Sequence, residues 1–135
     1  MVEKRSLTHD VYLFAFQMPD GLFIRCAFGN HVALRLRIAG EPVFRYYTVV
    51  PQCFVDETDQ TSGCYEDKDR FCFIIKIYKD GEFTSKLDEL KVGEAVEMSD
   101  VFAVDFDIQR ALANRSAIYL LAAGTGKEAR ACSPL

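Results

Sequence analysis

The sequence predicts a mostly β domain with one short helix. Short segments that are wholly apolar or that alternate apolar and polar residues recur along the chain, separated by turn residues. Half of the 135 residues are hydrophobic, with eleven Phe and six Tyr, so a single domain of this length can bury a core.

The first three predicted strands are separated by clear turns. Residues 11–18 are nearly all apolar, which predicts a strand covered on both faces. Residues 31–38 alternate between apolar side chains and a face that carries two arginines, which predicts a strand with one solvated face. A turn at residues 39–42 leads into a returning strand over 43–50. The apolar face of the second strand is Val32, Leu34, Leu36 and Ile38.

Further strands are predicted at residues 71–78, 94–99 and 118–122, and residues 105–115 are expected to be irregular or helical. An acidic, turn-rich segment at 55–70 interrupts the pattern. A loop of this length is uncommon in a compact domain, and it is either functional or a solvated surface insertion.

A two-turn helix is predicted between the fourth and fifth of these strands. Thr84 or Ser85 is suited to cap its N-terminus, and Gly93 is expected to end it. Leu87 and Leu90 are expected to face the core.

Two neighbouring strands each present a cation beside a tyrosine, because side chains two apart on a strand share a face. The pairs are Arg45 with Tyr47 and Lys76 with Tyr78. Arginine offers a fork of donors that matches phosphate oxygens, and a tyrosine ring offers a flat stacking surface. A tyrosine corner beside a lysine on a barrel surface explains the same pattern, so both interpretations stay open.

A glycine turn at residues 81–84 precedes the predicted helix. Such a turn leaves backbone N–H groups free at a position where the helix dipole favours an anion, and Thr84 adds a hydroxyl.

Five motifs occur in a fixed order along the chain. They are Phe-Gly-Asn-His-Val at 28–32, Arg-Tyr-Tyr-Thr at 45–48, Phe-Ile-Ile-Lys-Ile-Tyr at 73–78, Gly-Glu-Phe-Thr at 81–84 and Leu-Leu-Ala-Ala-Gly-Thr-Gly at 120–126. In this order they resemble the flavin-binding half of ferredoxin-reductase-type flavoproteins, specifically the NADH–cytochrome b5 reductases. The wording of the motifs is most similar to a reductase domain that is fused to a cytochrome b5 domain.

The resemblance implies a six-stranded antiparallel Greek-key barrel with one short capping helix, FAD as cofactor, and two units at 1–117 (FAD-binding barrel) and 118–135 (start of an NAD(P)H-binding domain). Arg45 would hold the pyrophosphate, Tyr47 would pack against the isoalloxazine, and Thr48 would be the catalytic residue near flavin N5. The implied cofactor-binding residues are Arg45, Tyr46, Tyr47, Thr48, Lys76, Tyr78, Gly81, Phe83, Thr84 and Thr125.

Some positions depart from the family pattern. Pro51 stands where the arginine motif ends in Ser, and after Gly126 the sequence differs from the family and ends at Leu135. The chain is therefore expected to lack the NADH half. Three functions remain open: an oxidoreductase domain passing electrons from NADH through FAD to a haem acceptor such as cytochrome b5, a flavin-binding fragment without turnover, and an unrelated small β-barrel binding module.

Composition argues against other classes. The net charge of -4 argues against a nucleic-acid partner, and no apolar run reaches the ~18 residues of a membrane-spanning helix. The five cysteines form no closely spaced pair, so we expect neither a metal site nor disulfides, and their odd number suits reduced, intracellular thiols. The family resemblance implies a location in the cytoplasm or at the cytoplasmic face of the endoplasmic reticulum. His31 is expected to be structural.

Overall fold

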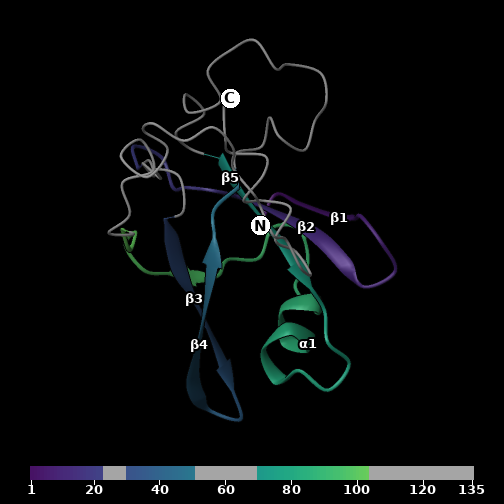
Figure 1. The fold of residues 1–135 in the computed structure, drawn as a ribbon. Helices are drawn as coiled ribbons and strands as arrows, with labels where there is room; N and C mark the ends of the chain where they lie inside the picture. Colours follow the sequence, from purple (N-terminus) through teal and green to yellow (C-terminus); the bar gives the residue numbers. More distant parts are fainter. Residues whose placement is uncertain (23–29, 51–69, 104–135) are drawn as a thin grey trace, which may run out of the picture.

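The structure is a computed structural model, and it describes residues 1–22, 30–50 and 70–103 (Figure 1). In these ranges the elements are β1 (Glu3–Ser6), β2 (Val11–Gln17), β3 (His31–Ile38), β4 (Glu41–Thr48), β5 (Arg70–Lys76), α1 (Glu82–Asp88) and β6 (Glu97–Met98). The prediction of an all-β domain with one short helix is confirmed for the described part of the chain.

The strands form two antiparallel sheets, with the orders β1-β2-β5 and β4-β3-β6 (Figure 1). The chain just after β4 connects them, because Val50 N–H donates to Cys72 O at 2.8 Å and Cys72 N–H donates to Val50 O at 3.1 Å. The described strands thus make a barrel-like pair of sheets, and no continuous closed barrel is formed by them.

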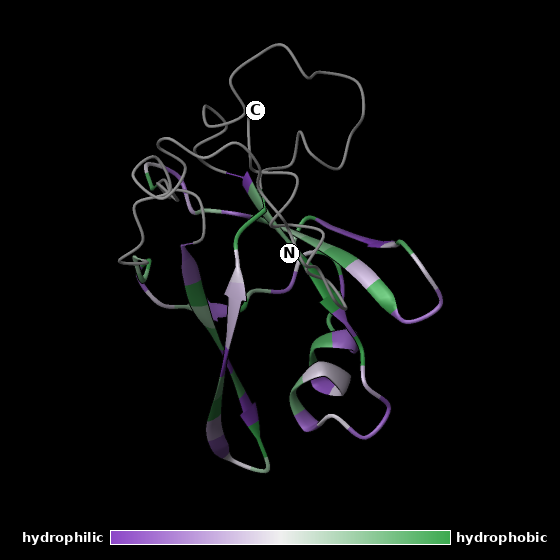
Figure 2. Cartoon of the chain, viewed as in Figure 1, coloured by the Kyte–Doolittle hydropathy of each residue, from purple (hydrophilic) through white to green (hydrophobic). Residues whose placement is uncertain are grey.

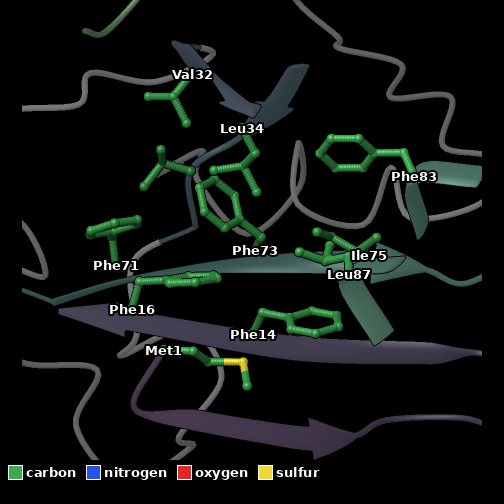
Figure 3. Packing of buried hydrophobic residues seen from close by; sticks show 11 residues of the cluster. Met1, Phe14, Phe16, Val32, Leu34, Phe71, Phe73, Ile75, Phe83 and Leu87 are labelled. Atoms are coloured by element: carbon green, nitrogen blue, oxygen red, sulfur yellow. The ribbon is translucent and has the colours of Figure 1, made fainter. Parts of the chain in front are cut away.

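The main core lies between the two sheets and α1 (Figure 3). Phe73 on β5 is fully buried, and its ring contacts those of Phe16 and Phe71 with centroid separations of 5.8 and 5.6 Å. Phe83 and Leu87 add the buried face of α1. The remaining buried members are Met1, Phe14, Val32, Leu34, Val49 and Ile75.

Strand β2 is buried on both faces, as its apolar run predicts. Phe14 and Phe16 point into the main core, while Leu13 and Ala15 belong to a second cluster that includes Cys72. Figure 2 shows β2 as a largely hydrophobic ribbon. Because both faces of this central strand are covered, the residues between its ends are hydrophobic.

Strand β3 also has the predicted alternation. Val32 and Leu34 are fully buried, and Leu36 and Ile38 pack against the same cluster. On the opposite face Arg35 pairs with Glu97 across to β6.

Several element bounds differ from the prediction. Strand β1 was not predicted, because it is only four residues long and polar. Its strand conformation depends on antiparallel pairing with β2. Strand β4 begins two residues earlier than predicted, β5 ends two residues earlier, and β6 has two residues. The predicted strand at 118–122, the segment at 105–115 and all but the last residue of the loop at 55–70 lie outside the described residues.

The predicted helix cap is wrong. The helix begins at Glu82 after Gly81, and Thr84 and Ser85 lie inside it, where both hydroxyls donate back to Tyr78 O. The helix ends at Asp88 instead of near Gly93, whose φ of 96° belongs to a later turn. Because both hydroxyls donate to acceptors in the turn before α1, neither caps the helix. Leu87 is buried and Leu90 packs against the core, as predicted.

We expect Phe73→Ala to lower the free energy of unfolding by about 3–5 kcal/mol, because it would empty a close-packed site at the contact between the sheets. Denaturant unfolding followed by circular dichroism measures this. The matched control is Phe44→Ala, since Phe44 is 47% exposed, and its loss should stay under about 1 kcal/mol. Similar losses for the two variants would contradict this account of the core.

Candidate functional site

A pocket of about 330 Å³ lies where the ends of β4 and β5 meet the turn into α1. This volume is within the usual range for small-molecule sites. Its lining residues are Arg45, Tyr47, Ile74, Ile75, Lys76, Tyr78, Gly81, Glu82, Phe83 and Thr84. The pocket therefore combines two cations, two tyrosines and a hydroxyl.

Strand β4 supplies Arg45 and Tyr47 on one face. The guanidinium carbon of Arg45 lies 5.9 Å from the centroid of the Phe83 ring, and its Nη1 donates to Phe44 O at 2.7 Å. Among the described residues no carboxylate pairs with Arg45. Its remaining donors can therefore bind an anion.

Tyr47 lies between the core and the pocket. Its ring centroid is 6.0 Å from that of Phe73 and 6.1 Å from that of Phe83. Burial raises the pKa of the Tyr47 phenol to about 12, and the nearby charge of Arg45 opposes this only in part. The side chain therefore stays neutral at physiological pH and offers a flat, uncharged ring.

Strand β5 and the residues after it supply Lys76 and Tyr78. Lys76 Nζ lies 2.9 Å from Asp10 Oδ2 and 5.7 Å from the centroid of the Tyr78 ring. A hydrogen bond from Lys76 lowers the pKa of the Asp10 carboxyl, and the same bond raises the pKa of the lysine. Both groups are thus charged, and this cation at the pocket has a partner.

The turn into α1 is held by Thr84. Tyr78 N–H donates to Thr84 Oγ1 at 3.2 Å, and the hydroxyl lies 3.3 Å from its acceptor, Gly81 O. A Cβ at position 81 would lie 2.5 Å from Thr84 Oγ1 and 3.0 Å from Tyr78 Cβ. Only glycine fits there without a shift of the turn, and the turn forms one wall of the pocket.

The structure brings together most of the site residues predicted from the sequence. Those that line the pocket are Arg45, Tyr47, Lys76, Tyr78, Gly81, Phe83 and Thr84. The assignment of cofactor contacts to them stays a prediction.

Two of the predicted site residues lie away from the pocket, and a third is not among the described residues. Tyr46 is on the opposite face of β4, 63% exposed, with its ring 5.6 Å from that of His31 and 5.5 Å from that of Phe102. Thr48 ends β4 opposite His31 and does not line the pocket. Thr125 lies outside the described residues. The alternation of β4 places Tyr46 away from the pocket, while the motif alone had included it. His31 is stacked on Phe102 with a ring-centroid separation of 5.5 Å, and its structural role stays a prediction.

Ile74, Ile75 and Glu82 line the pocket but were not predicted. Ile74 shares a face with Lys76 by the same two-residue period that linked Lys76 to Tyr78, so the sequence carried a signal for it. Glu82 directly follows Gly81, and only the position of α1 shows that it borders the pocket.

Within residues 1–22, 30–50 and 70–103 no group of three or more His, Cys, Asp or Glu side chains could hold a metal ion. In the same ranges no helix is long and apolar enough to cross a membrane.

Comparison with known proteins identifies relatives of this domain. Cytochrome b5 reductase 4 of Mus musculus is 32% identical over 93% of this chain, and the match spans 23% of that protein. The solved CS-b5R domains of human Ncb5or (NAD+ form) are 31% identical, with a TM-score of 0.70 over 81% of this chain and 30% of that one. The cytochrome b5 reductase domain of Ulva prolifera nitrate reductase is 28% identical, with a TM-score of 0.58 over 75% of this chain and 37% of that one.

The chain thus spans about a quarter of the length of the curated reductase that it matches. The sequence profile described as the oxidoreductase FAD-binding domain matches residues 1–100, which include every described strand and α1. The chain therefore belongs to the oxidoreductase FAD-binding domain family, as a domain of the cytochrome b5 reductase type.

Proposed function

We propose that the pocket between β4, β5 and α1 holds FAD. The observation that carries this proposal is an arginine that has no carboxylate partner among the described residues, beside a neutral, half-buried tyrosine ring in one pocket. Arg45 would bind the pyrophosphate through charge-assisted hydrogen bonds, and Tyr47 would pack against the isoalloxazine. Lys76 and Tyr78 would flank the cofactor.

The turn after β5 supports the phosphate end of this site. Gly81 permits close approach of the backbone, and Thr84 keeps the turn in place through its bonds to Tyr78 and Gly81. The Phe83 ring contacts both the Arg45 guanidinium and the Tyr47 ring, and it thereby helps to hold both side chains in the pocket wall. The residues present therefore fit a ligand that joins a flat ring to a pyrophosphate.

We propose that this domain serves an NADH-dependent oxidoreductase reaction that delivers electrons to a haem protein such as cytochrome b5. Bound FAD would supply the redox chemistry, accepting a hydride and releasing single electrons, while the protein binds and orients it. The names of the matched relatives support this reaction class. We also propose an intracellular location, in the cytoplasm or at the cytoplasmic face of the endoplasmic reticulum.

Thr48 remains the proposed catalytic residue through the family motif alone. It lies at the end of β4, one residue beyond Tyr47, so a hydroxyl there is close in sequence to the ring-binding position. A test of Thr48 must therefore separate its effect on turnover from any effect on FAD binding.

We expect Arg45→Ala to weaken FAD binding by about 10- to 150-fold, because a charge-assisted hydrogen bond to phosphate contributes about 1.5–3 kcal/mol. Titration of the apoprotein with FAD, followed by flavin fluorescence, measures this, and the parent chain should bind with a Kd below ~100 µM. Arg37→Ala is the matched control, since Arg37 is an exposed arginine on β3 that bonds only to Gly40 O in the described structure. Equal affinities for the two variants would remove the site assignment.

For the 135-residue polypeptide tested alone, we expect FAD binding without NADH-dependent reduction of ferricyanide or cytochrome b5. Hydride transfer needs the nicotinamide held within roughly 3–3.5 Å of flavin N5, and the family resemblance assigns that task to a second domain. A steady-state assay with excess FAD and NADH is the measurement. Turnover clearly above that of free flavin, and abolished by Thr48→Val with FAD affinity retained, would show that these 135 residues suffice.

A further inference from the structure

Asp10 pairs with one of the cations of the pocket without being one of its lining residues. Its carboxylate Oδ2 lies 2.9 Å from Lys76 Nζ, and Lys76 is one of the two cations that line the pocket. The other, Arg45, has no carboxylate partner among the described residues. The two cations of the pocket are therefore not equivalent.

Asp10 is held in place from several sides. Thr8 Oγ1 donates to Asp10 Oδ1 at 3.1 Å, and Ile77 N–H donates to Asp10 O at 2.7 Å. Lys76 is the antiparallel partner of Val11, the next residue after Asp10. The backbone pairing of β2 with β5 thus brings Asp10 and Lys76 side by side.

The ammonium group of Lys76 makes contacts on two sides. Lys76 Nζ sits over the Tyr78 ring, with 5.7 Å to its centroid, while Asp10 binds it from the β2 side. His9 Nε2, 3.5 Å from Asp10 Oδ2, is 88% exposed and makes only a loose additional contact. Lys76 is therefore the principal charged partner of Asp10.

We propose that Asp10 compensates the charge of Lys76 beside the pocket and thereby lowers the affinity of the pocket for an anionic ligand. Arg45 is then the cation with which the pocket binds an anionic ligand. The inference rests on the proposed function in one respect, namely that the anionic ligand of this pocket is FAD. Its chemical content is that the paired lysine adds little net charge to the attraction between the pocket and its ligand.

The proposal predicts opposite effects from the two halves of the pair. Asp10→Asn leaves Lys76 as an uncompensated cation, which should tighten FAD binding about two- to fivefold, the size expected of one exposed charge pair. Lys76→Gln leaves Asp10 as an uncompensated anion and should weaken binding by a similar factor. The double variant is again neutral and should return close to the parent affinity.

The chain contains a matched control away from the pocket. Lys4 Nζ and Asp88 Oδ1 are 2.8 Å apart, and Lys4 also lies over an aromatic ring, 5.2 Å from the centroid of Tyr12. Asp88→Asn and Lys4→Gln therefore remove the same kind of pair at comparable exposure. Neither should change FAD affinity by more than about twofold.

The experiment is titration of each apoprotein with FAD at low and at high salt, with circular dichroism as the check of folding. The gain in Asp10→Asn should shrink at high salt, because exposed charges are screened. Asp10→Glu, which keeps the charge, should bind like the parent. If Asp10→Asn does not fold, Asp10→Ser and the contrast between Lys76→Gln and Lys4→Gln serve the same purpose.

Weaker or unchanged binding in folded Asp10→Asn would overturn the proposal, as would shifts of both single variants in the same direction. A merely structural role for Asp10 predicts that common weakening. Arg45→Ala, included in the same series, distinguishes a wrong pocket assignment from a wrong role for Asp10. If it binds FAD like the parent, the pocket itself is wrongly assigned; if it binds weakly while Asp10→Asn does not differ from the parent, only the role of Asp10 fails.

Discussion

The contact of the Tyr47 ring with Phe73 on one side and Phe83 on the other joins the core of this domain to its pocket. Phe73 lies at the meeting of the two sheets, and Phe83 is the buried end of α1. The same packing that closes the core therefore sets the distance between β4 and the turn after β5. Close-packed interiors respond to changes of a single methylene, so a pocket attached to such a core has a defined shape.

Charge is arranged on this frame by the neighbouring strands. The Arg45 guanidinium lies over the Phe83 ring and has no carboxylate partner among the described residues, whereas Lys76 pairs with Asp10, which directly precedes β2, and lies over the Tyr78 ring. Two cations that look alike in the sequence thus have different surroundings. An arginine with free donors suits bidentate recognition of phosphate, while a paired lysine adds a donor at a fixed position with little net field.

Much of the fold followed from local pattern. The apolar run of β2, the alternation of β3 and the inward positions of Leu87 in α1 and Leu90 just after it could be predicted, because burial on a strand or helix imposes a period on the sequence. Strand β1 was missed because its residues are polar and its structure depends on pairing with β2. The helix start was misplaced because Thr84 and Ser85 bond to the turn before them, a competition that their residue types alone do not reveal.

The sequence by itself determined the type of domain and predicted which residues would contact a ring and a phosphate, since a strand period and an ordered set of motifs are properties of the chain alone. The tertiary structure decided which of those residues share one pocket. It placed Tyr46 on the outer face with His31, brought Glu82 to the rim, and gave Lys76 its partner from β2. The physical reason is that strand pairing sets contacts between residues far apart in sequence, and Asp10 and Lys76 are neighbours only through the register of β2 with β5.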